Sequence, residues 1–161
     1  MRLSRTKKWV AGAVGVVVVG VFAAVALASL PMNFTTTTLV TANLTDAVRQ
    51  NHDGIKFQTK DPTDVRVQKV DIAAGGFSGW HHHPGVVIVA VLSGSVNVSD
   101  SHCNQETYGP GLPNGSVFTE GGTDPGQVSS TTGATTYATL IAPHADPPVF
   151  RIEDNPPHCA S

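Results

Sequence analysis

Two histidines separated by one residue stand directly before a continuous apolar run in this chain. His81 and His83 precede residues 86–92, which read Val-Val-Ile-Val-Ala-Val-Leu. Successive side chains of an extended strand point to opposite faces, so His81 and His83 share one face and His82 takes the other. Neutral imidazole is a common ligand for transition metals, and a buried strand would hold the pair rigidly. The spacing therefore predicts one half of a metal site.

The elements that must position this pair are predicted to be β-strands. Residues 65–72 alternate between apolar and polar side chains, with a change of phase at Gln68 and Lys69 that suggests a bulge. Glycine and proline separate the strand patterns, and no convincing helix follows residue 52. These features indicate an all-β chain that forms an antiparallel sandwich or barrel. The other strand patterns lie at residues 55–57, 86–92, 95–99, 116–120 and 135–142.

Residues 75–94 resemble the first motif of the cupin family, with Gly75 and Gly94 at its ends and His81 and His83 as its histidine pair. Residues 107–111 and 116–122 are similar to the turn and the following strand of the second motif. Over most of residues 55–159, the order of elements resembles small exported bacterial cupins that share a cysteine pair. The resemblance implies a cupin-type antiparallel β-barrel, also called a double-stranded β-helix or jelly roll. It further implies one divalent metal ion (Mn, Fe, Ni or Zn), bound by two histidines and a glutamate of the first motif and a histidine of the second.

The chain departs from that pattern at two of the four implied ligands. The glutamate position falls on Val87, and the second-motif histidine position falls near Ser129. Two histidines alone would give a weak site that is open to water. Glu120 would rebuild a set of two histidines and one carboxylate, as in non-haem iron(II) oxygenases, and is the third metal ligand that we expect with His81 and His83. Other side chains that could fold inward from loops are His102, Glu106, Asp124 and His144.

The N-terminus predicts export. Four basic residues within the first eight precede an uncharged apolar run at residues 9–30, which ends in Ala-Leu-Ala at 26–28. This pattern fits either a cleaved signal peptide or an uncleaved signal-anchor helix, and both place the rest of the chain outside the cytoplasm. We therefore expect an export or anchor segment at 1–30, a Thr-rich tether at 31–42 and a barrel domain at 43–161.

The two cysteines and the charge limit the chemistry further. Cys103 and Cys159 are the only cysteines, and in an exported chain they are expected to form a disulfide. Beyond the N-terminal segment the chain has no Lys/Arg cluster, and acidic residues outnumber basic ones there, so we expect no nucleic-acid partner.

Two functions from different classes agree with these patterns. The first is a small-molecule binding or accessory protein of the cell envelope, with a weak or degenerate metal site. The second is a metal-dependent oxidoreductase or isomerase that uses His81 and His83. The fold cannot decide between them, because such barrels host unrelated chemistries. Both functions need an unidentified small molecule as partner. An uncleaved N-terminal segment would also attach the protein to the membrane. A homodimer is a further possibility that the sequence leaves open.

Overall fold

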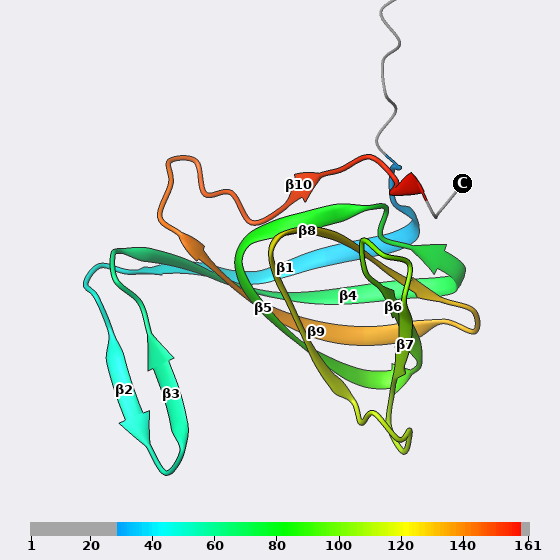
Figure 1. The fold of residues 1–161 in the computed structure, drawn as a ribbon, viewed down its shortest axis with the longest axis horizontal. Helices are drawn as coiled ribbons and strands as arrows, with labels where there is room; N and C mark the ends of the chain where they lie inside the picture. Colours follow the sequence, from blue (N-terminus) through cyan, green and yellow to red (C-terminus); the bar gives the residue numbers. More distant parts are fainter. Residues whose placement is uncertain (1–28, 159–161) are drawn as a thin grey trace, which may run out of the picture.

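The computed structural model describes residues 29–158, and its regular elements are ten β-strands, with no α-helix in this part of the chain (Figure 1). The predicted all-β antiparallel class is therefore confirmed. The strands are β1 (Met32–Leu44), β2 (Arg49–His52), β3 (Ile55–Gln58), β4 (Thr63–Phe77), β5 (His81–Gly94), β6 (Val96–Ser99), β7 (Gln105–Tyr108), β8 (Val117–Ser130), β9 (Ala134–Pro143) and β10 (Ile152–Glu153).

Four long strands form a closed ring of antiparallel pairings. β4 pairs with β9, β9 with β5, β5 with β8, and β8 returns to β4, where Phe77 lies opposite Ser129. β1 adds to the outer edge of β4, the β6–β7 pair follows β8, and the short β10 pairs with the start of β5 (Figure 1). Because the sheet curves back on itself, every second side chain of these strands faces one shared interior.

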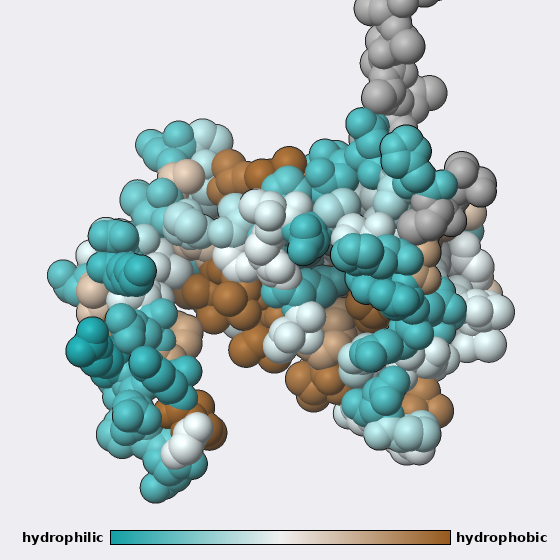
Figure 2. All heavy atoms as spheres, viewed as in Figure 1, coloured by the Kyte–Doolittle hydropathy of each residue, from teal (hydrophilic) through white to brown (hydrophobic). Residues whose placement is uncertain are grey.

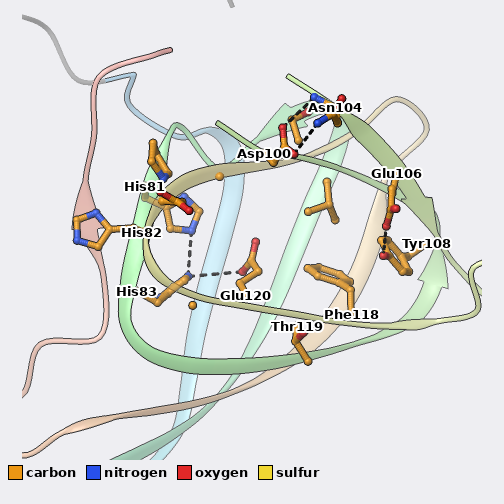
Figure 3. A pocket seen from close by; sticks show the side chains of 16 residues that line it. His81, His82, His83, Asp100, Asn104, Glu106, Tyr108, Phe118, Thr119 and Glu120 are labelled. Atoms are coloured by element: carbon orange, nitrogen blue, oxygen red, sulfur yellow. Dashed lines mark hydrogen bonds and ion pairs between the residues drawn. The ribbon is translucent and has the colours of Figure 1, made fainter. Parts of the chain in front are cut away.

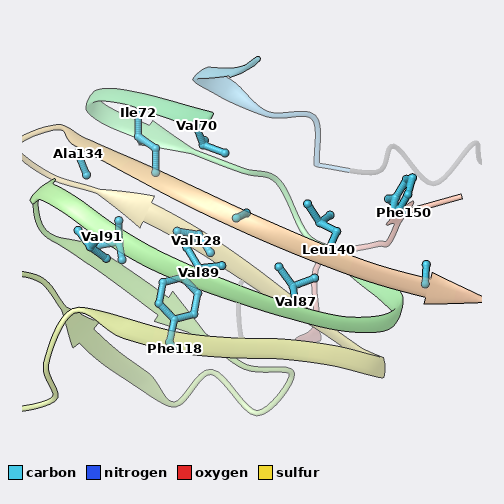
Figure 4. Close-up of a cluster of buried hydrophobic side chains, with 13 residues drawn as sticks. Val70, Ile72, Val87, Val89, Val91, Phe118, Val128, Ala134, Leu140 and Phe150 are labelled. Carbon is cyan, nitrogen blue, oxygen red and sulfur yellow. The ribbon is translucent and has the colours of Figure 1, made fainter. Parts of the chain in front are cut away.

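Alternating residues of β5 show how this interior is filled. Val87, Val89 and Val91 are 2–6% exposed and belong to the core, which Figure 4 shows enclosed between the strands. Val86 and Ile88 point outward, and 51% and 44% of their surfaces are exposed. Apolar side chains therefore lie on both faces of β5, which explains why the sequence shows an unbroken apolar run there. Figure 2 shows part of this apolar surface on the outside of the molecule.

The predicted tether at 31–42 is wrong, because these residues belong to β1. This strand pairs with β4 from Met32 to Leu44. It lies at the edge of the sheet, and nearly all of its residues are exposed, so the sequence shows no burial periodicity. Threonine nevertheless favours the extended backbone, because its β-branched side chain fits a pleated surface. The folded domain therefore begins before residue 43.

The predicted bulge in β4 is also absent. β4 pairs with β9 without interruption from Thr63 to Ile72. The irregularity of the β1–β4 pairing that lies beside Gln68 falls on β1, between Thr38 and Val40. The sequence changes phase because two polar side chains, Arg66 and Gln68, occupy the same face of β4 as Val70 and Ile72. The interior therefore has a polar section at one end of β4.

The β2–β3 pair is an exposed hairpin that projects from the body (Figure 1). Its turn has positive φ at Asp53 (49°) and Gly54 (84°), as a two-residue type I′ turn requires.

In residues 29–158 no helix is long and apolar enough to cross a membrane. The predicted export segment, residues 1–30, lies outside the described residues except for its last two. Cys159 also lies outside them. Export and the disulfide therefore stay predictions.

Candidate metal centre

The start of β5 turns two histidine side chains toward each other. His81 and His83 are 5% and 7% exposed, and their Nε2 atoms lie 3.1 Å apart (Figure 3). His82 points away, and its Nδ1 lies 2.7 Å from a carboxylate oxygen of Asp154, which follows β10. The alternation predicted from the sequence is therefore present, with His81 and His83 on the inner face.

Glu120 of β8 joins this pair. One of its carboxylate oxygens lies 3.5 Å from the Nε2 of His83, and the ligand atoms of His81, His83 and Glu120 all lie within 4.8 Å of one another (Figure 3). In the β5–β8 pairing Glu120 lies directly opposite Val87, and residues paired in this way point to the same face. The carboxylate therefore comes from the neighbouring strand, at the level where the cupin motif would place its glutamate.

Backbone carbonyls fix the orientation of both imidazoles. The Nδ1 of His81 lies 3.0 Å from the carbonyl oxygen of Gly79, and the Nδ1 of His83 lies 2.5 Å from that of Phe150. A carbonyl oxygen only accepts, so both Nδ1 atoms carry hydrogen, and in this tautomer the Nε2 of each ring is the nitrogen with a free lone pair. Two facing lone pairs repel each other, and a metal ion bound between them would remove this repulsion. Carbonyl partners on the second nitrogen are common among metal-binding histidines.

The charge state of His81 favours a metal ligand. Burial lowers the pKa of His81 to about 4, and the positive charge of Arg151 contributes to the shift. The ring is therefore neutral near pH 7, with its lone pair available.

The separation of the two histidine nitrogens fits one transition-metal ion. Two neighbouring nitrogen ligands at 2.0–2.1 Å from one ion in tetrahedral or octahedral geometry lie about 2.8–3.4 Å apart. The two Nε2 atoms, at 3.1 Å, fall within this range, and the distance from His83 to Glu120, at 3.5 Å, is just above it. Only the carboxylate has to move inward, and its side chain is 16% exposed and so has room to move.

The position predicted for the second-motif histidine does not face this site. Ser129 pairs with Phe77 on one side and Asn97 on the other. Its neighbours Val128 and Ser130 are the buried residues, at 7% and 1% exposure, so alternation turns Ser129 to the opposite face. Ser129 therefore supplies no ligand to this site, and its neighbour Val128 lines the inner cavity that His81 and His83 also line.

The other candidate ligands do not join the cluster within residues 29–158. His144 pairs with Asp64, at 2.9 Å, on another part of the molecule. His102 lies in an exposed loop next to Ser101. Glu106 and Asp124 line the pocket outside the cluster, and Glu106 accepts a hydrogen bond from Tyr108.

Two cavities reach His81, His83 and Glu120 from different sides. The outer pocket, of about 360 Å³, is lined by the acidic residues Asp100, Glu106 and Asp124 (Figure 3). The inner cavity, of about 160 Å³, has mostly apolar walls together with Arg66 and Arg151. Sequence reasoning missed Arg66, Arg151 and Phe150 as residues of the site. The change of phase in β4 was the one sequence signal that could have pointed to Arg66.

Comparison with known proteins gives distant structural similarity only. No family model matches the chain, and no curated protein matches it. A conserved SPY1581 protein of unknown function from Streptococcus pyogenes is similar over 70% of this chain and 76% of its own, with 16% identity and a TM-score of 0.48.

Two further solved structures are enzymes. DMSP lyases are similar at 16% identity over 56% of this chain and 44% of theirs, with a TM-score of 0.45. A salicylate 1,2-dioxygenase variant from Pseudoaminobacter salicylatoxidans is similar at 17% identity over 58% of this chain and 25% of its own, with a TM-score of 0.41. The chain thus spans less than half the length of either enzyme, and these similarities assign it to no family.

Proposed function

We propose that this chain is a cupin-type β-barrel that binds one divalent transition-metal ion through His81, His83 and Glu120. We further propose that it acts on a small molecule as a metal-dependent oxidoreductase or isomerase. One observation carries the proposal: three ligand atoms lie within 4.8 Å of one another, two of them on imidazoles whose other nitrogens face carbonyl oxygens. Two neutral imidazoles and one carboxylate are the donor set of many mononuclear iron(II) enzymes.

The number of ligands favours catalysis over a purely structural ion. Structural zinc sites usually have four protein ligands, whereas catalytic sites have three and keep a position for water or substrate. Val87 is a core residue and supplies no fourth ligand. When bound, the ion would polarise a substrate oxygen or activate a bound water. His81 and His83 would hold it rigidly, while Glu120 offsets part of its charge.

A second candidate is a small-molecule binding or accessory protein. The inner cavity favours it, because its walls are mostly apolar and it is as large as cavities that hold a single aromatic ring. The two candidates differ in turnover: a binding protein retains its ligand unchanged, whereas the enzyme converts it.

We also propose that the folded domain lies outside the cytoplasm and that Cys103 is bonded to Cys159. The basic start and apolar run of residues 1–30 support export, and an oxidising compartment would support the disulfide. Labelling of thiols in the unfolded, unreduced protein tests the second part. No thiol should react if the bond is present, and two reacting thiols would contradict it.

Calorimetric titration of the metal-free, untagged protein with Zn²⁺, Mn²⁺ and Ni²⁺ tests the metal site. We expect one ion per chain, no measurable binding for the double variant His81→Ala with His83→Ala, and an affinity at least about tenfold lower for Glu120→Gln, which loses an anionic ligand. Two matched controls should bind as the natural chain does: His82→Gln on the outward face, and Glu106→Gln in the outer pocket. Equal binding by the natural chain and the double variant would refute the proposal.

A further inference from the structure

Arg66 faces the metal-site residues across the interior. Register places four residues at one level of the sheet, because Arg66 of β4 pairs with Leu140 of β9, Leu140 pairs with Val87 of β5, and Val87 pairs with Glu120 of β8. Residues paired in this way point to the same face of the sheet. Arg66 and Glu120 are the two ends of this row of four residues, and both side chains therefore belong to the interior face. Both line the inner cavity.

Phe150 connects Arg66 to the histidine pair. The guanidinium carbon of Arg66 lies 4.2 Å from the centroid of the Phe150 ring, while the carbonyl oxygen of the same residue accepts the Nδ1–H of His83. One residue of the C-terminal segment therefore touches both groups. The aromatic face of Phe150 limits the movement of the Arg66 guanidinium.

The guanidinium of Arg66 has no acidic partner among residues 29–158. Its Nε donates to the hydroxyl oxygen of Thr41 at 3.3 Å, and its terminal N–H groups make no further hydrogen bond to the described residues. Arg151, the other arginine of the inner cavity, differs in this respect. It makes two hydrogen bonds to Glu153 and one to the carbonyl oxygen of Ser78, so its charge and donors are used within the fold.

We propose that the inner cavity binds a small organic monocarboxylate, whose carboxylate is held by Arg66 and whose uncharged part points toward His81, His83 and Glu120. The inference rests on the proposed function, because it names the substrate class of the same site. The terminal N–H groups of a guanidinium form a planar fork that matches the two oxygens of a carboxylate. A volume of about 160 Å³ accommodates a body of roughly one aromatic ring.

The charges on the two sides of the site agree with this orientation. Asp100, Glu106 and Asp124 line the outer pocket and would repel a carboxylate placed there. Glu120 is the acidic residue that lines the inner cavity. A divalent ion bound to Glu120 would more than offset its negative charge, so that the ion and Arg66 would together give the inner cavity a positive charge. A monoanion is therefore attracted to the Arg66 side.

Titration of metal-free and zinc-loaded protein with benzoate, and with the neutral isostere benzamide, tests the inference. We expect one benzoate per chain and at least tenfold weaker binding of benzamide. The affinity for benzoate should fall about 10–100-fold in Arg66→Gln and less in Arg66→Lys, which keeps the charge but loses the fork. Arg49→Gln, an exposed arginine of the β2–β3 hairpin, should bind as the natural chain does. In the unaltered protein, benzoate should shift the NMR signal of the Arg66 Nε–H, which needs no variant.

The outcomes separate the two proposals. If zinc binds but benzoate and benzamide bind equally, or if Arg66→Gln loses nothing, the carboxylate site is refuted and the metal site stands. If benzoate binds through Arg66 but zinc does not bind, the metal-dependent function fails and the Arg66 site stands. A loss of zinc affinity in Arg66→Gln equal to its loss of benzoate affinity would mean that Arg66 only supports Phe150 and His83, and would also overturn the inference.

Discussion

Acid should destabilise the metal-free protein through His81. This histidine is buried as the neutral ring, with a pKa lowered from 6.5 to about 4. Below pH 6.5 the unfolded chain therefore binds a proton at this residue that the folded chain rejects until the pH reaches about 4. The free energy of unfolding falls as the pH falls through this window, and linkage gives a loss of about 2 kcal/mol between pH 7 and pH 5.

Urea unfolding at pH 7 and pH 5, with a chelator present, measures this loss. The natural chain and His81→Gln differ only in the histidine, so other titrating groups affect both and cancel in the comparison. We expect the loss on acidification to be about 2 kcal/mol smaller in His81→Gln than in the natural chain. His52→Gln, in the exposed β2–β3 hairpin, should keep the full loss. The same pH dependence in all three proteins would show that His81 is not held neutral by burial.

Three further predictions concern how the sheet positions the ligands. Exchanging the paired residues, as Val87→Glu with Glu120→Val, should retain zinc binding above that of Glu120→Val alone, because both positions face the site at one level. Calorimetry measures this, and no recovery would contradict the shared level. Ser129→His should leave zinc affinity unchanged, since this residue faces away. Gly85→Ala should lower the free energy of unfolding by about 1–3 kcal/mol, because the added Cβ would lie 1.9 Å from the carbonyl oxygen of Ile141; a urea midpoint equal to that of the natural chain would refute it.

The sequence is sufficient to predict the orientation of the histidine pair. Alternation along an extended segment places His81 and His83 together whatever the neighbouring strands are. The sequence also indicates Glu120 as a candidate ligand, but it does not show why the Glu120 side chain lies beside the two histidines. It depends on the register between β5 and β8, which pairs it with Val87 and which two bulges near His83 help to set. A single sequence does not reveal such a register.

Other parts of the site depend on contacts between distant segments. Phe150 lies far from β5 in the chain, and its backbone carbonyl, rather than its side chain, orients His83. No residue type at that position would reveal a carbonyl acceptor. Arg66 and Gln68 are visible in the sequence as a break in alternation, and such a break also predicts a bulge. Polar residues on the inner face of a strand give the same pattern, and functional sites are where such exceptions are expected.

The most direct test of the central claim is a crystal structure of the zinc-loaded protein with anomalous data collected at the zinc edge. We expect one anomalous peak per chain, at about 2.0–2.2 Å from the Nε2 atoms of His81 and His83 and from a carboxylate oxygen of Glu120. A peak elsewhere, or no peak with the two imidazoles still 3.1 Å apart, would contradict it. The second result would mean that the two rings approach each other without a metal ion between them.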